Sequence, residues 1–127
     1  MHNVTILGYE HAYASAITGA LDLFALAGVT WKRMQGKTPE RIFNVQLASV
    51  GKRDVECINH LTIKSQIAIE DVQQTDILII PTIGGKLDDV LAKNRNLLPF
   101  IQYFYAQDSD IASNCSGAFF LAEAGIL

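Results

Sequence analysis

The sequence predicts an α/β domain whose mainly parallel sheet is covered by helices on both faces. Two observations predict it. The strand-like segments are continuously apolar rather than half polar, and helical patterns alternate with them along the chain. Val4-Thr-Ile-Leu7 and Ile77-Leu-Ile-Ile80 are the clearest apolar runs, and we expect both at the centre of the sheet.

The first half of the chain has three further patterns. Apolar residues recur at helical spacing from Ile17 to Ala27, which predicts a helix with Ser15 as N-cap and Gly28 as its stop. The polar segment Lys32–Pro39, broken by glycine and proline, is predicted to be a loop. Alternation over Phe43–Leu47 predicts a strand.

The second half continues the alternation. Val55–Ile63 is predicted to be a hairpin or bent strand that turns at Asn59-His60. After the Ile77–Ile80 strand, helical spacing recurs twice before a last strand and helix. The predicted segments are a short helix over Ala68–Gln74, helices over Leu87–Leu91 and Leu97–Tyr105, a strand over Asp110–Asn114, and a helix over Ser116–Ala124 stopped by Gly125.

The length of 127 residues fits one domain, residues 1–127, without an internal repeat or linker. Half of the residues are hydrophobic and 18% are charged, which excludes a disordered chain. A sheet of this kind normally continues beyond a helix like the last one. We therefore expect the chain to be a piece of a longer domain.

Charge and cysteine content exclude several functions. The net charge is −3 and the bases are scattered, so this chain is a poor candidate for binding nucleic acid. The longest uncharged stretches have 12 residues, too few to span a membrane. Cys57 and Cys115 lie in no metal-binding pattern, so we expect no metal and no cofactor. No secretion signal is present at the N-terminus, and a cytoplasmic location is expected.

Ser113-Asn114-Cys115-Ser116-Gly117 is the most informative motif. A small residue, a nucleophile and a glycine at alternate positions, between a strand and a helix, are typical of a nucleophile elbow, here with cysteine. The following helix start would favour the thiolate form of Cys115. The alternative is an ordinary buried cysteine of the core.

Two loops are expected beside this motif, because ligands of open α/β sheets bind at the carboxyl ends of the strands. Gly84-Gly85 follows one strand and could bring backbone N–H groups close to a ligand, or could simply be a turn. Tyr9-Glu10-His11 follows another. A cysteine nucleophile needs a histidine within hydrogen-bond reach, and His11 and His60 are the candidates.

The chain resembles the ThiJ/PfpI superfamily, which has the class I glutamine amidotransferase-like fold, and is most similar to the N-terminal domains of AraC-type transcription regulators. The last segment is the most specific for that regulator branch. The segments that carry the resemblance are Val4–Leu7 with Thr18–Phe24, Asp76–Pro81 with Gly84-Gly85, Ile111–Cys115, and Ser116–Leu127.

The resemblance also has departures. Enzymes of the superfamily place an Asp or Glu before the first helix, where it contacts the elbow cysteine; the same register here gives Ala16, which cannot ionise. The Pro-Gly-Gly motif that is usual after the fourth strand is interrupted here by two residues, as Pro81-Thr-Ile-Gly-Gly85. A conventional catalytic histidine would come from beyond Leu127. The resemblance therefore implies a domain that keeps the pocket and has lost the catalysis.

The first hypothesis is a ligand-sensing, non-catalytic domain of an AraC-type regulator, with DNA contacted by a C-terminal domain outside this chain. A homodimer is a further expectation of the resemblance. The second hypothesis is a stand-alone cysteine hydrolase or isonitrile hydratase-like enzyme, with Cys115 as nucleophile and Glu10 or His11 as base. The Gly85 and Ser116 N–H groups would be its oxyanion donors. The third is a structural dimerisation domain. The expected contacts of the small molecule are Tyr9, Glu10, Gly84, Gly85, Asn114, Cys115 and Ser116.

Overall fold

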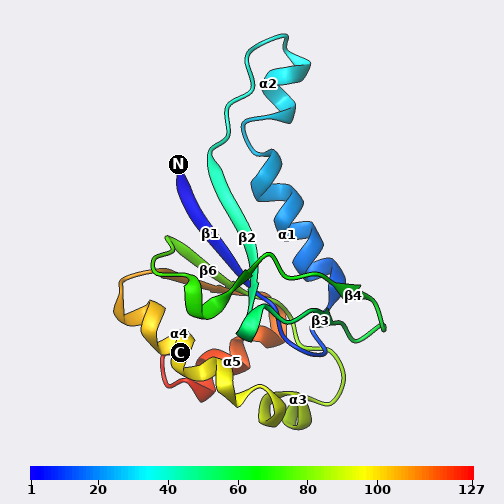
Figure 1. Ribbon diagram of the computed structural model, residues 1–127, viewed down its shortest axis with the longest axis vertical. Coiled ribbons are helices and arrows are strands. Elements are labelled where there is room, and N and C mark those ends of the chain that lie inside the picture. Colours follow the sequence, from blue (N-terminus) through cyan, green and yellow to red (C-terminus); the bar gives the residue numbers. More distant parts are fainter.

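Five parallel strands form the centre of the molecule. The computed structural model describes residues 1–127, and Figure 1 shows β1, β2 and β6 side by side. The strand order in the sheet is β5-β2-β1-β6-β7. The strands are β1 (His2–Leu7), β2 (Phe43–Ser49), β5 (Ile67–Ala68), β6 (Ile77–Ile80) and β7 (Asp110–Ser113).

The central position of β1 and β6 confirms the predicted parallel sheet. Val4 of β1 is in register with Val45 of β2 on one side and with Ile77 of β6 on the other. Val4 to Leu7 are at most 4% exposed. Successive residues of a strand point to opposite faces, so both faces of β1 are covered.

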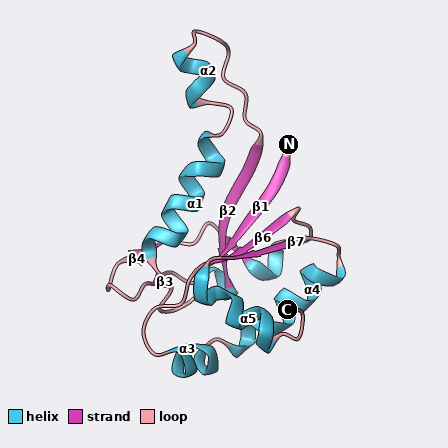
Figure 2. Ribbon diagram, turned by 180° about the vertical axis from the view of Figure 1, so that it is seen from behind, coloured by secondary structure: helices cyan, strands magenta, loops and turns pink.

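Helices connect the strands and cover the sheet. The first helix packs against β1 and β2, and the fourth contacts both β7 and the fifth helix (Figure 2). One cluster of 22 buried residues joins these layers into a single core. The helices are α1 (Ala14–Leu26), α2 (Thr30–Met34), α3 (Leu87–Lys93), α4 (Leu98–Ala106) and α5 (Ala118–Glu123).

A short antiparallel hairpin lies outside the main sheet, so of the two predicted alternatives for Val55–Ile63, hairpin or bent strand, the hairpin is confirmed. It consists of β3 (Val55–Glu56) and β4 (Thr62–Ile63). His60 in its turn has a φ of 68°. The hairpin is tied to the loop after β1, because the His11 N–H donates to Glu56 O at 2.8 Å.

The predicted N-cap of α1 is wrong. The residue before the helix is Tyr13, which makes no side-chain cap bond, and Ser15 lies exposed inside the first turn. A serine near a helix start predicts a cap only to within a residue or two. The predicted stop is confirmed: Gly28 follows the C-cap with a φ of 78°, a conformation that favours glycine.

Three other segments differ from prediction. Lys32–Pro39 is not wholly a loop, because α2 ends at Met34. Ala68–Gln74 is not a helix: Ile67–Ala68 pairs with β2, and a single 3₁₀ turn, Ile69–Asp71, follows. The last helix begins later than Ser116, because a 3₁₀ turn over Cys115–Gly117 precedes α5. Each segment is too short to show a reliable period.

None of the five helices has the length and apolar character needed to cross a membrane.

Candidate functional site

Cys115 lies where the chain leaves β7 and turns into the 3₁₀ turn that precedes α5. Its φ is 49°, in the left-handed region that L-residues rarely adopt, and its side chain is exposed. Gly117 allows this tight turn, because a Cβ there would lie 2.6 Å from Ile80 O and 2.7 Å from Pro81 O. The geometry thus presents the thiol at the carboxyl edge of the sheet.

Ser116 joins this turn to the loop after β6. Its Oγ lies 2.9 Å from Thr82 Oγ1 and accepts a hydrogen bond from the Ile83 N–H at 3.0 Å. Ile83 in turn forms an isolated bridge with Ala12 of the loop after β1. The turns that follow β1, β6 and β7 are therefore one connected rim.

Gly84 and Gly85 lie against the loop after β1. The Gly84 N–H donates to His11 O at 2.8 Å, and a Cβ at this position would lie 2.5 Å from Ile58 Cβ. The Gly84 N–H is thus used within the protein and is not a free oxyanion donor. Gly85 has a φ of 72° and is exposed.

Tyr9 is a buried part of the rim rather than a freely exposed contact. It is 4% exposed, its hydroxyl donates to Pro81 O, and its ring meets Phe120 edge-on at 4.9 Å. Burial raises the pKa of the Tyr9 hydroxyl above its ordinary range. Tyr9 therefore serves as a neutral hydrogen-bond donor.

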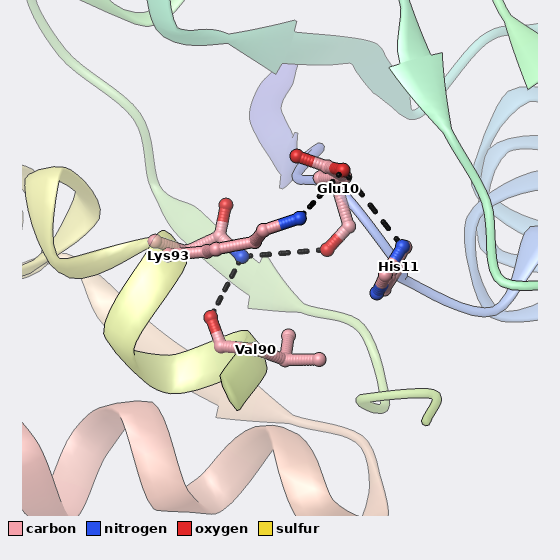
Figure 3. A network of polar contacts seen from close by, with 5 residues as sticks. Glu10, His11, Val90 and Lys93 are labelled. Carbon is pink, nitrogen blue, oxygen red and sulfur yellow. Dashed lines mark hydrogen bonds and ion pairs between the residues drawn. The ribbon is translucent and has the colours of Figure 1, made fainter. Parts of the chain in front are cut away.

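Glu10 is the centre of a polar network at the same edge (Figure 3). Its carboxylate forms an ion pair with Lys93 Nζ at 3.3 Å and lies 3.8 Å from His11 Nε2. Asn94 Nδ2 donates to the Glu10 carbonyl at 3.3 Å and to Val90 O at 2.8 Å. Of the two candidate histidines, His11 contacts an acid, whereas His60 lies exposed in the hairpin turn.

A hollow of about 260 Å³ opens beside this network. Tyr9 and Glu10 line it, whereas Gly84, Gly85, Asn114, Cys115 and Ser116 do not. Most of its lining is polar or charged. The residues are Gly8, Tyr9, Glu10, Ser49, Val50, Arg53, Asp54, Val55, Glu56, Lys93, Asn94, Asn96 and Leu97.

Sequence reasoning missed Arg53, Lys93 and Asn94 as lining residues. Arg53 follows the carboxyl end of β2, so the rule that ligands bind at these ends could have indicated it. Lys93 and Asn94 end a helix far along the chain, and only the fold brings them to Glu10. The structure contains no group of three or more His, Cys, Asp or Glu side chains arranged to hold a metal ion.

The two cysteines have opposite environments. Cys57 is 3% exposed in the hairpin and its Sγ lies 3.9 Å from Val55 O. Burial raises the pKa of the Cys57 thiol. Cys115 is exposed, and its Sγ makes no hydrogen bond with another side chain. Reagents in solvent thus reach Cys115 without any opening of the core.

Comparison with known proteins gives a family and a set of similar folds. The sequence profile of the DJ-1/PfpI family matches residues 27–127. No curated protein matches the chain significantly. A putative transcriptional regulator from Vibrio parahaemolyticus has a similar structure, with a TM-score of 0.74 and 22% identity over 99% of this chain and 62% of its own.

Two further solved structures share the fold. An AraC family transcriptional regulator from Pseudomonas putida matches with a TM-score of 0.72 and 20% identity, over 100% of this chain and 63% of its own. Oxidized DJ-1 from Toxoplasma gondii matches with a TM-score of 0.72 and 18% identity, over 100% of this chain and 63% of its own. The chain thus spans less than two thirds of these relatives, and identities this low show the fold alone.

Proposed function

This chain belongs to the DJ-1/PfpI family, and from that premise we propose that it is the small-molecule-sensing part of a transcription regulator rather than a catalytic domain. The ligand occupies the carboxyl edge of the sheet, at the hollow beside Glu10. DNA is contacted by a part of the regulator outside residues 1–127. Cys115 is a redox-sensitive thiol at the same edge, outside that hollow.

The separation of the thiol from the charged hollow is the observation that carries this proposal. Glu10, Lys93 and Arg53 line a cavity that Cys115 does not line. A cysteine nucleophile needs a base within hydrogen-bond reach, yet the Cys115 thiol has no such partner and Glu10 is held by Lys93. Ala16, where the family's enzymes are expected to carry an acid, lies within α1.

The similar structures add support of a different kind. Two proteins described as transcriptional regulators share this fold over 99% or more of the chain. Their likeness alone does not distinguish sensing from catalysis, since DJ-1 itself matches with the same TM-score as one of them. The residues at the carboxyl edge are what supports sensing over catalysis in this proposal.

Binding of small charged probes tests the proposal. The hollow carries cations and carboxylates, so succinate, putrescine and glutamate cover the three charge types that it could bind. We expect at least one to shift the backbone NMR signals of Glu10, Lys93 and Asn94 and to raise the melting temperature. Lys93→Gln should abolish a shift caused by succinate or glutamate, because it removes a positive charge, and it should change stability by no more than about 1 kcal/mol, as expected of an exposed ion pair. Absence of any probe-induced shift would count against this site.

A cysteine hydrolase is the second candidate, and one contact favours it. His11 lies 3.8 Å from Glu10, and its Nδ1 lies 3.9 Å from the position that a Cβ on Gly85 would take. An acid–histidine pair is thus present near the glycine loop. Ester hydrolysis that is lost in both Cys115→Ala and His11→Asn, but kept in Cys57→Ala, would establish this function in place of sensing.

A further inference from the structure

The hollow beside Glu10 has an excess of negative charge in its lining. Its charged residues are the carboxylates Glu10, Asp54 and Glu56 and the cations Arg53 and Lys93, a net charge of −1. Lys93 Nζ lies 3.3 Å from the Glu10 carboxylate, so these two groups balance each other (Figure 3). Asp54, Glu56 and Arg53 form no ion pair within the chain. Two carboxylates and one guanidinium therefore remain to meet a ligand.

Asn94 adds an unused hydrogen-bond acceptor to the same hollow. It lines the hollow and is only 8% exposed. The two groups that its amide contacts, Glu10 O and Val90 O, are both carbonyl oxygens, so the atom that faces them is the Nδ2 donor. Oδ1 accepts no hydrogen bond from the protein, yet every fully buried side-chain nitrogen and oxygen has a partner. The free oxygen is thus open to the hollow.

These groups together define the chemistry of a matching ligand. An acceptor in so buried a place is costly to leave unpaired, so the ligand must carry N–H or O–H donors. The unpaired carboxylates require positive charge. A primary ammonium group has three donors and one positive charge, whereas a quaternary ammonium has no donor and a carboxylate has neither. The protein's own Lys93 ammonium already occupies one carboxylate at this place.

We propose that the hollow binds a small primary amine, whose ammonium group donates to Asn94 Oδ1 while Asp54 and Glu56 balance its charge. This inference rests on the proposed function, because it names the ligand class of the same site. Val50, which also lines the hollow, offers apolar surface to the methylene chain of such an amine. An organic cation is thereby favoured over an anion or a zwitterion.

Putrescine and succinate test the sign of the charge, because they are four-carbon chains with opposite charges. In calorimetric titrations, putrescine should bind at least about tenfold more tightly than succinate or glutamate. N-permethylated putrescine keeps both positive charges but cannot donate to Asn94 Oδ1, so it should bind at least about tenfold more weakly than putrescine. Equal affinity for the two amines would overturn the inference. Tighter binding of succinate or glutamate would also overturn it but leave the sensing site in place, whereas no binding of any probe would count against both.

Charge-removing variants test which residues hold the amine. Asp54→Asn and Glu56→Gln should each weaken putrescine binding about three- to fivefold, as expected for partly exposed charge pairs. Lys93→Gln should strengthen it, because the Glu10 carboxylate loses its internal partner; for an anionic ligand the effect has the opposite sign. Asp22→Asn, an equal change at an exposed residue of α1 outside the hollow, is the control. Unchanged affinity in both carboxylate variants, or weaker binding in Lys93→Gln, would refute the assignment.

Discussion

The hydroxyl oxygen of Ser116 lies 2.9 Å from that of Thr82, and this contact joins the cysteine turn to the loop after β6. Ser116 Oγ also accepts the Ile83 N–H, so one side chain satisfies two polar groups of the neighbouring loop. The residue next to Cys115 is thus held by the fold. The position of the thiol depends on it.

Ser116→Ala should therefore lower the free energy of unfolding by about 1–2 kcal/mol, because the Ile83 N–H and the Thr82 hydroxyl lose a partner in a largely buried place. Urea denaturation measures the change. Ser15→Ala is the matched control, since Ser15 is exposed and caps no helix; its effect should stay within about 0.5 kcal/mol. Equal losses in both variants would show that the Ser116 contacts do not stabilise the rim.

Two glycines should respond to alanine in opposite directions. At Gly84 an added Cβ would lie 2.5 Å from Ile58 Cβ and 2.8 Å from His11 O, so Gly84→Ala should destabilise the fold by about 1–3 kcal/mol. At Gly19, within α1, the added Cβ meets nothing within 4 Å. Gly19→Ala should stabilise by about 0.5–1 kcal/mol through helix propensity. Thermal or urea unfolding of the two variants measures both changes in stability. A Gly84→Ala variant as stable as wild type would contradict the close packing of the loop after β6 against the loop after β1.

The sheet could be predicted because its strands carry strong local signals. Val4–Leu7 and Ile77–Ile80 are apolar at every residue or nearly so, and such runs are typical of strands covered on both faces. The parallel arrangement then followed from the helical patterns between the strands. The edge strand Ile67–Ala68 was missed because two residues carry no periodicity, and only pairing with β2 defines it.

The helix α2 was missed for a different reason. Trp31 and Met34 are exposed, so α2 buries no apolar face against the core that a pattern could reveal. Local periodicity reports which face of a helix is buried, and α2 has no buried residue.

The candidate site was predictable only in part. Cys115 and the loops at the carboxyl edge followed from motif and topology rules. The Glu10–Lys93 and Glu10–Asn94 contacts join residues more than 80 positions apart, and no local pattern encodes them. Which strand-end residues line a common hollow depends on how the loops pack.

The buried hydroxyl of Tyr9 should make stability fall at high pH. The pKa of this hydroxyl is raised in the folded state, so the folded protein favours the neutral tyrosine. The stability that the neutral Tyr9 contributes is fully present below the unfolded pKa of about 10. It is lost as pH rises above that value, by up to about 1.4 kcal/mol per pH unit. Tyr9→Phe should flatten the fall in unfolding free energy between about pH 10 and 11, although it loses the bond to Pro81. The slope for Tyr13→Phe, at an exposed tyrosine, should match wild type. An unchanged slope in Tyr9→Phe would contradict the prediction.

Cys115 should react with a small thiol reagent before Cys57. Cys115 is exposed, whereas Cys57 is 3% exposed and burial raises the pKa of its thiol, which lowers the thiolate fraction at neutral pH. Labelling of Cys57 also requires local opening of the hairpin, so we expect a rate ratio of at least about tenfold at pH 7. Mild peroxide should likewise oxidise Cys115 first.

Iodoacetamide labelling followed by peptide mapping measures both rates in one sample. In denaturant the two rates should become similar, which separates the effect of the fold from that of local sequence. If Cys57 reacts first in the native protein, or the two react equally, the exposed setting of Cys115 is refuted, and with it the role of this thiol as a redox sensor.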